Sequence, residues 1–418
     1  MKSPRGAPGS WAPPPLRRAL LSALCVAVVA TSAKRGSAEP PVLRPLLLGE
    51  TDLRFDAPDR TEGEDGFSAV RLRLGAGLDL GSFLRAVAQA EWARDKPALL
   101  DAYVELRPLP GWAFRVGASK TPLFTNARDE TVFSLPVPER PLVVSSFWPG
   151  RDLGVEVHKL PVPALPLEAW ARVGNGSGAV LGNDNSQFAV DLRLDVALGR
   201  ARAEPLSTSP FGLRLGGGLH LDSVEDRPGV NGVTAGGFGF YRPSTVSGPR
   251  RVVEAHAVLF AGPVKLTGEA AIADESRSRD TDGDPETPRV DLPKVRSTGA
   301  YVEAAWMIVG PRRRPGAWPV STPWNVWDWG GLELAGRFER LRFGRGAPDV
   351  QAGGATTGAV ALRWWATSYA ALSAAFYRYG YDTPPIEEPS RSSSWVALCR
   401  LTFRAPESLS AALPGPSR

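Results

Sequence analysis

The fold is decided by residues 101–120, which read DAYVELRPLPGWAFRVGASK. Two short segments in this stretch alternate between polar and apolar residues, and a Pro-Gly turn separates them. In the first, Asp101, Tyr103, Glu105 and Arg107 oppose Ala102, Val104 and Leu106; in the second, Trp112, Phe114 and Val116 oppose Arg115 and Ser119. Such alternation is typical of β-strands, whose successive side chains point to opposite faces. The stretch predicts a membrane hairpin with one face toward lipid and the other toward water.

The first 38 residues predict a signal peptide that is removed on export. Arg17 and Arg18 precede an apolar run over residues 19–30, which is too short to span a bilayer, and small residues follow as far as Ala38. Loss of its six lysine and arginine residues leaves 43 basic against 44 acidic residues, a net charge of about −1. The sequence pI of 9.3 is therefore no argument for nucleic-acid binding.

Segments of alternating hydrophobicity recur along the rest of the chain. No apolar run there approaches the roughly 20 residues of a membrane helix, so entry into a membrane requires a closed sheet. The predicted strands are 43–55, 67–79, 82–93, 98–107, 112–120, 151–158, 166–173, 187–198, 211–221, 251–260, 264–272, 297–309, 329–343, 357–366, 369–379 and 393–403. They number about sixteen, an even number as bacterial barrels require, and we assign Gly232–Tyr241 to a loop.

The connections between these strands alternate between short and long. With the N-terminus in the periplasm, the short connections lie on the periplasmic side and the long ones outside. Residues 121–150 are then the third external connection. Residues 310–328 depart from the rule, because they are long although they fall on the periplasmic side.

Several motifs resemble those of the phosphate-selective porin O/P family. They are AYVELRPLPGWAFRVGASKTPLF (102–124), PERP (138–141), PGRDLGVEVH (149–158) and NGSG (175–178), with weaker echoes in LLLGETDLRFD (46–56) and STGAYVEAAWMIVG (297–310). The resemblance implies an outer-membrane antiparallel β-barrel of a Gram-negative bacterium over residues 39–403, followed by a tail at 404–418. It also implies a third external loop folded into the lumen, and a homotrimer.

Basic residues are the candidate pore-lining and anion-selecting groups, because guanidinium and ammonium groups attract anions in a narrow pore. Arg71, Arg73, Arg85 and Arg115 face the predicted lumen by alternation, and Lys120, Arg128, Arg140 and Arg151 flank or occupy the loop at 121–150. Carboxylates such as Glu91, Glu105 and Glu156 face the same way. The alternative is therefore that lumen charges pair across strands and form a generic lining.

Aromatic residues near strand ends predict the two interfacial girdles of a membrane barrel. They are Trp92, Trp112, Trp306, Trp329, Trp364, Trp395 and Phe403. The acidic run Asp280–Glu286 lacks the spacing of a calcium loop and is interpreted as a solvated external loop without a metal.

The sequence predicts a porin that allows passive diffusion of small anionic or neutral solutes. GxSxG, HExxH and P-loop motifs are all lacking, so neither enzyme activity nor a cofactor is expected. Outer-membrane lipid and lipopolysaccharide are the other expected partners, and no nucleic acid is expected. Two alternatives stay open: a secreted β-rich carbohydrate-binding or adhesion protein, and an occluded barrel with a structural role.

Overall fold

The computed structural model describes residues 42–57, 66–93, 96–162, 165–176, 187–199, 211–280, 288–313, 329–386 and 388–404, with a few isolated positions between and beyond them. Sixteen strands of this described part form the wall of a barrel. They are β1 (Val42–Ala57), β2 (Gly66–Leu80), β3 (Leu84–Ala93), β4 (Lys96–Leu109), β5 (Trp112–Lys120), β6 (Arg151–Lys159), β7 (Leu167–Gly174), β8 (Ala189–Gly199), β9 (Phe211–Pro228), β12 (Thr245–Ala261), β13 (Val264–Arg279), β14 (Val290–Val309), β15 (Gly331–Arg345), β16 (Gly353–Trp365), β17 (Ala370–Tyr381) and β18 (Ser393–Arg404).

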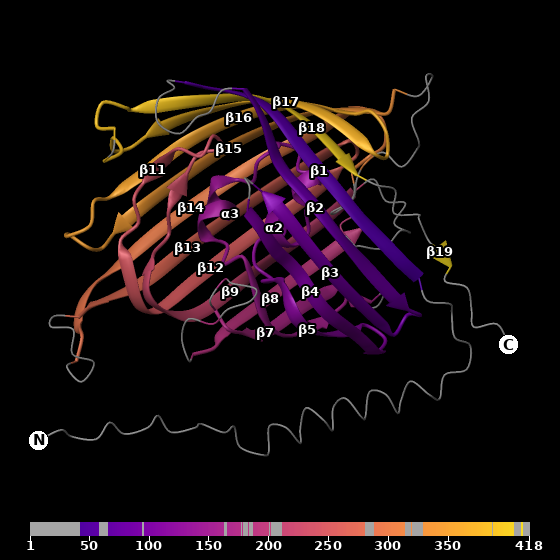
Figure 1. The fold of residues 1–418 in the computed structure, drawn as a ribbon, viewed down its shortest axis with the longest axis horizontal. Coiled ribbons are helices and arrows are strands. Elements are labelled where there is room, and N and C mark those ends of the chain that lie inside the picture. Colours follow the sequence, from indigo (N-terminus) through magenta and orange to yellow (C-terminus); the bar gives the residue numbers. More distant parts are fainter. Residues whose placement is uncertain are drawn as a thin grey trace, which may run out of the picture.

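The sheet closes on itself (Figure 1). Each wall strand pairs antiparallel with the next, and β1 pairs with both β2 and β18. The prediction of an all-β, antiparallel barrel of about sixteen strands is confirmed. No helix among the described residues is long and apolar enough to cross a membrane.

The two ends of the barrel differ. The end at which β1 stops, called the loop end below, lies on the left of Figure 1 and carries residues 121–150 and 229–244. The opposite end, called the turn end, carries short turns such as residues 110–111. Most connections are therefore long at the loop end and short at the turn end, as the sequence predicts; the exceptions are the two-residue connection 94–95 at the loop end and the long connection 310–330 at the turn end.

Several strands extend further toward the loop end than the alternation indicates. β13 runs on to Arg279 and β14 begins at Val290, so each is about seven residues longer than predicted. The segment added to β13 is polar on both faces, as in Glu275–Arg279, and the segment added to β14 mixes Val290, Leu292 and Val295 with charged residues. Hydrophobic alternation marks only the part of a strand that contacts an apolar phase, so it misses these extensions.

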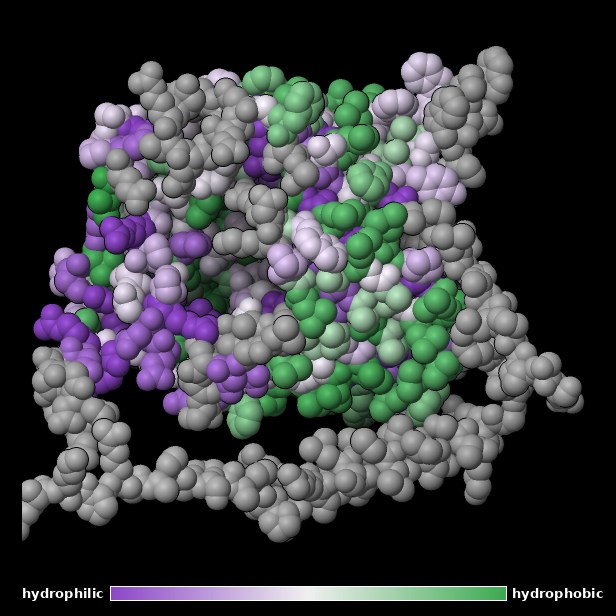
Figure 2. Space-filling view, viewed as in Figure 1, coloured by the Kyte–Doolittle hydropathy of each residue, from purple (hydrophilic) through white to green (hydrophobic). Residues whose placement is uncertain are grey.

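Side chains divide between the two faces of the wall as the alternation predicts. The basic residues Arg71, Arg73, Arg85 and Arg115 face the lumen, whereas Val302, Phe338 and Phe376 belong to the many exposed apolar residues outside. Figure 2 shows hydrophobic side chains over β2–β5, and hydrophilic ones gathered toward the loop end. Six of the seven aromatic residues predicted for the girdles lie on the outward face, and the seventh, Trp329, is exposed just before β15.

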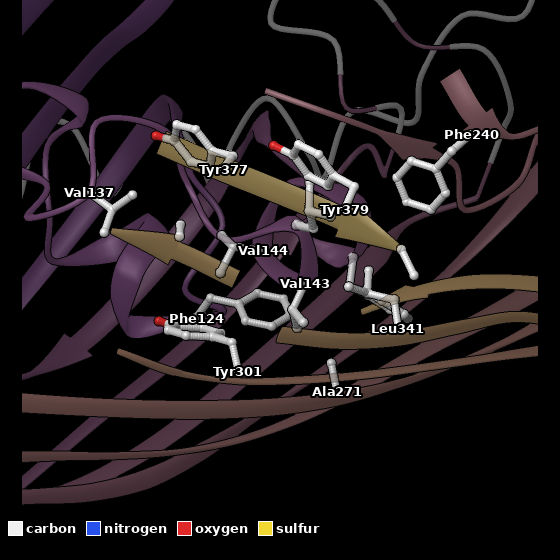
Figure 3. Close-up of a cluster of buried hydrophobic side chains, with 14 of the residues drawn as sticks. Phe124, Val137, Val143, Val144, Phe240, Ala271, Tyr301, Leu341, Tyr377 and Tyr379 are labelled. Atoms are coloured by element: carbon white, nitrogen blue, oxygen red, sulfur yellow. The ribbon is translucent and has the colours of Figure 1, made fainter. Parts of the chain in front are cut away.

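Residues 121–150 fold into the lumen, as predicted. They form α2 (Thr125–Arg128), the 3-10 helix η1 (Val132–Ser134) and α3 (Leu142–Phe147). Phe124, Val143 and Val144 are fully buried against inward residues of the wall, including Tyr301 and Leu341 (Figure 3). We call this segment the constriction loop.

A second external segment also folds inward, which the sequence did not predict. Residues 229–244 contain β10 (Gly232–Val233) and β11 (Gly239–Tyr241), which form a separate two-stranded sheet that is not part of the barrel wall. The assignment of this segment to a loop is therefore confirmed. Its Phe240 stacks on Tyr381 with ring centroids 5.3 Å apart, and its Tyr241 stacks on Phe343 at 4.6 Å.

The long connection at the turn end is only partly described, because most of residues 314–328 lie outside the described ranges. Its beginning enters the lumen. Arg313 is buried, pairs with Glu333 and donates to the carbonyl oxygen of Ser134 at 2.8 Å. The signal peptide predicted at 1–38 lies outside the described residues, as do most of Asp280–Glu286 and of the tail at 404–418.

The outward apolar face can be tested by replacing Val360 with arginine. Val360 is 56% exposed on β16, opposite Gly336, and a charge at the middle of the lipid-facing band costs about 2–4 kcal/mol. We expect Val360→Arg to lower the free energy of unfolding by this amount in guanidinium titrations of the protein in phospholipid vesicles.

Thr298→Arg is the matched control. Thr298 also faces outward, but it pairs in register with Arg342, beyond the apolar band. A change of about 0.5 kcal/mol or less is expected there. Equal effects of the two substitutions would contradict a membrane-embedded wall.

Candidate pore constriction

Inward carboxylates of the wall hold the backbone of the constriction loop. The amide of Asn126 in α2 donates to Glu269 Oε1 at 2.7 Å, and the amide of Leu142 at the start of α3 donates to Glu339 Oε2 at 2.5 Å. The loop is thereby fixed to β13 and β15.

Inward basic residues hold the carbonyl groups of the same loop. Arg363 donates to the carbonyl oxygens of Phe133 and Leu135 at 2.7 and 2.5 Å, and Arg337 to that of Glu139 at 2.8 Å. Both arginines face the lumen, and the constriction loop buries them there, so that carbonyl groups take the place of water around them.

Glu139 anchors the loop to the seam between β1 and β18. Its carboxylate pairs with Arg400 and lies 3.4 Å from Arg54 and 3.9 Å from Arg71. Burial raises the pKa of this carboxyl, but the guanidinium groups, Arg400 foremost, outweigh burial and lower the pKa to about 2. Glu139 is therefore ionised throughout the physiological range.

The constriction loop leaves a cavity beside β1–β6, with a volume of about 490 Å³. Its described lining includes the basic residues Arg73, Arg115, Lys120, Arg128, Arg151 and Arg404, a single carboxylate, Asp101, and the rings of Tyr103 and Phe133. Opposite the cavity, the lumen is filled by the apolar cluster of the constriction loop, residues 229–244 and inward tyrosines (Figure 3).

Six of the eight predicted site residues contact carboxylates, as the alternative of cross-strand pairing expects. Arg71 pairs with Glu50 at 3.0 Å, Arg73 with Glu91 at 2.5 Å, Arg85 with Asp79 at 3.7 Å, Arg115 with Glu105 at 2.6 Å, Arg128 with Glu156 at 3.1 Å and Arg151 with Asp101 at 3.0 Å. Arg71 and Arg85 do not line the cavity.

Lys120 and Arg140 differ from these six. Lys120 Nζ donates to the carbonyl oxygens of Ala127 and Glu130 at 2.6 and 3.2 Å. Arg140 donates to Asn126 and, at 3.2 Å, to the same carbonyl oxygen of Glu130. Within the part of the chain that the structure describes, neither cation has a carboxylate within salt-bridge distance.

Arg140 lies in a positive environment. It does not line the cavity, but it donates to the same carbonyl oxygen of Glu130 as the lining residue Lys120. Its guanidinium and that of Arg151 lie over the ring of Trp148, at 5.9 and 6.0 Å from the centroid. Burial and the nearby Arg151, Arg71 and Arg73 together lower the pKa of Arg140 to about 9. A bound anion would relieve this repulsion.

Two aromatic lining residues were not among the predicted site residues. The alternation places Tyr103 on the water-facing side, and its ring lies under the guanidinium of Arg115, with 4.4 Å between the guanidinium carbon and the ring centroid. Phe133 lies likewise under Arg73 at 5.2 Å. Alternation could have indicated Tyr103, whereas no periodic signal marks Phe133 within the loop.

The three histidines face the lumen and contact carboxylates. The contacts are His158 with Glu168 at 2.9 Å, His220 with Asp191 and Asp222 at 2.7 and 3.2 Å, and His256 with Asp195 and Glu254, both at 3.1 Å. Among the described residues, no group of histidine, cysteine and acidic side chains is arranged to hold a metal ion.

No family model and no curated protein matches this chain. Several solved structures do match. One is OmpT of Vibrio cholerae, an outer membrane protein in its trimer form, whose sequence is 10% identical to this chain. The structural match has a TM-score of 0.56 and covers 88% of this chain and all of OmpT. The anion-selective porin from Comamonas acidovorans is 11% identical with a TM-score of 0.54, over 87% of this chain and all of that one.

The outer membrane channel DcaP of Acinetobacter baumannii is a third match. It is 10% identical with a TM-score of 0.52, over 88% of this chain and 99% of that one. At such low identities the likeness concerns the fold alone. The chain therefore has the fold of the outer-membrane porins.

The role of Glu139 can be tested with Glu139→Gln. Loss of the buried charge leaves Arg400 and Arg54 less compensated, and breaking such a pair costs about 3 kcal/mol. We expect a matching loss in the free energy of unfolding in guanidinium.

The same contribution should disappear in wild type at low pH. Because the pKa of Glu139 is lowered by folding, the stabilisation is present above the ordinary carboxyl pKa and is lost as pH falls toward about 2. A variant as stable as wild type at neutral pH would contradict this role.

Proposed function

We propose that this protein is an outer-membrane porin that passes small solutes by passive diffusion and prefers anions. The observation that carries the proposal is the cavity beside the constriction loop, whose described lining holds six basic side chains and one carboxylate. The fold shared with outer-membrane porins supports both the channel and its location. Export by the predicted signal peptide at 1–38 belongs to the same proposal.

The anion preference depends on Lys120 and Arg140. The other site cations are largely offset by adjacent carboxylates, whereas these two bind only neutral carbonyl and amide groups among their described partners. An uncompensated charge acts strongly on ions in a narrow passage, because little water screens it. Small anions, with phosphate among them by the family resemblance, are the solutes this arrangement favours, and small neutral solutes also pass.

We propose further that the protein forms a homotrimer through β1–β5. A shallow apolar groove of about 370 Å³ crosses the outward face of these strands, between small residues such as Ala76, Ala86, Ala88 and Ala102. Small residues let two walls approach closely. The trimer form of OmpT, which shares this fold, agrees with the proposal.

The first experiment neutralises the two cations in Lys120→Gln/Arg140→Gln. Each lost charge should lower the ratio of anion to cation permeability roughly threefold. The measurement is the reversal potential of single channels in planar bilayers under a salt gradient. A wild-type channel without conductance would favour the occluded barrel instead.

Arg85→Gln is the control, because Arg85 lies outside the cavity and pairs with Asp79, and it should leave the reversal potential unchanged. The pH dependence gives a second check. Arg140 is charged below its pKa of about 9, so its contribution should be present at neutral pH and lost as pH rises through that value. A double variant with wild-type selectivity would remove both residues from the site.

The trimer is tested with Ala88→Trp, which fills the groove between β2 and β4. We expect this variant to elute as a monomer, with the mass measured by light scattering in detergent, whereas wild type elutes as a trimer. Ala270→Trp, on the exposed outward face of β13, should remain trimeric. A wild-type monomer would refute the assembly.

A further inference from the structure

The outward faces of β12, β13, β15 and β17 change from apolar to charged near the loop end. Toward that end, the last exposed apolar residue of a strand is followed on the same face by a charged one. The pairs are Val253 and Arg251 on β12, Ile272 and Asp274 on β13, Phe338 and Arg340 on β15, and Phe376 and Arg378 on β17. Such a step marks the level at which hydrocarbon gives way to headgroups.

Basic residues outnumber acidic ones at this level. Arg251 and Arg296 share one carboxylate, Asp274, each at 2.6 Å, and Arg340 pairs with Asp382 at 2.6 Å. Arg342 and Arg378 have no carboxylate partner among the described residues, and Arg378 donates to Ser393 Oγ at 3.0 Å. The surface therefore carries an excess of positive charge.

The other half of the wall lacks this feature in its described part. At the same end, β1, β2, β3, β7 and β8 present exposed apolar or aromatic residues: Phe55, Phe67, Trp92 and Val173, with Phe188 just before β8. A basic rim is therefore no general property of this barrel. It belongs to the side away from the proposed trimer contact, which faces lipid.

An apolar groove of about 600 Å³ lies next to Arg378. Its walls are Val302, Phe338, Val360 and Phe376, and Arg378 stands at its edge. The groove exists because Gly336 and Gly358 take positions where other strands carry a side chain. A Cβ added at Gly358 would meet nothing within 4 Å.

We propose that this surface, formed by Arg342, Arg378 and the groove, binds a lipid with a phosphorylated headgroup. Arginine matches the geometry of phosphate oxygens with two parallel hydrogen bonds, and an acyl chain fills the groove below. Charge complementarity at the hydrocarbon boundary favours a lipid over a protein partner. The inference rests on the proposed outer-membrane location and is independent of the proposed anion preference.

The test compares wild type with Arg342→Gln/Arg378→Gln, using diphosphoryl lipid A as the probe. Binding is measured by native mass spectrometry of the detergent-solubilised protein. Loss of the two arginines should weaken binding about tenfold or more. Lipid A from which both phosphates have been removed should bind the two proteins equally weakly.

Two further variants keep the result interpretable. Arg342→Lys/Arg378→Lys retains the charge and should keep most of the affinity, whereas Arg44→Gln removes an exposed arginine at the turn end and should change nothing. Reversal potentials of the glutamine variant should match wild type, which separates this proposal from the channel proposal. Equal affinity of wild type and Arg342→Gln/Arg378→Gln for diphosphoryl lipid A would overturn it.

Discussion

The pairing of β1 with β18 is the constraint on which the rest of the structure depends. It runs in continuous register from Leu48 opposite Arg404 to Ala57 opposite Trp395, so neither strand is left as an open edge. In lipid each unsatisfied backbone group costs several kcal/mol, and only a closed sheet avoids that cost. Closure in turn separates inside from outside, and it assigns alternate residues to lumen and lipid.

A closed lumen imposes a second requirement, because charges that are removed from bulk water need partners. The wall supplies some through cross-strand pairs, such as Arg73 with Glu91. The constriction loop supplies the others: its carbonyl groups accept from Arg363 and Arg337, and its amides donate to Glu339. The loop therefore takes the place of water as the hydrogen-bonding partner of the buried arginines.

The sequence predicts the wall well and the contents of the lumen poorly. Alternation in residues 101–120 reports the direction of each side chain, so the inward position of Arg115 could be predicted. Alternation does not report which groups of the lumen an inward side chain contacts. Arg363 binds the carbonyl oxygen of Phe133, which is 230 residues away in the chain. The inward fold of residues 229–244 and the contact of Arg313 with Ser134 have no periodic signal for the same reason.

The carbonyl oxygen of Glu130 accepts from both Lys120 and Arg140, the two predicted site residues that contact no carboxylate among the described residues. If anions pass as proposed, an anion that accepts hydrogen bonds from these two cations does so at the expense of their hydrogen bonds to the constriction loop. Retention of the anion would then be self-limiting, since every gain in contact with the anion weakens the loop that holds the cations in place. Such competition favours rapid release over tight capture, and a conducting passage needs ions to leave as readily as they enter.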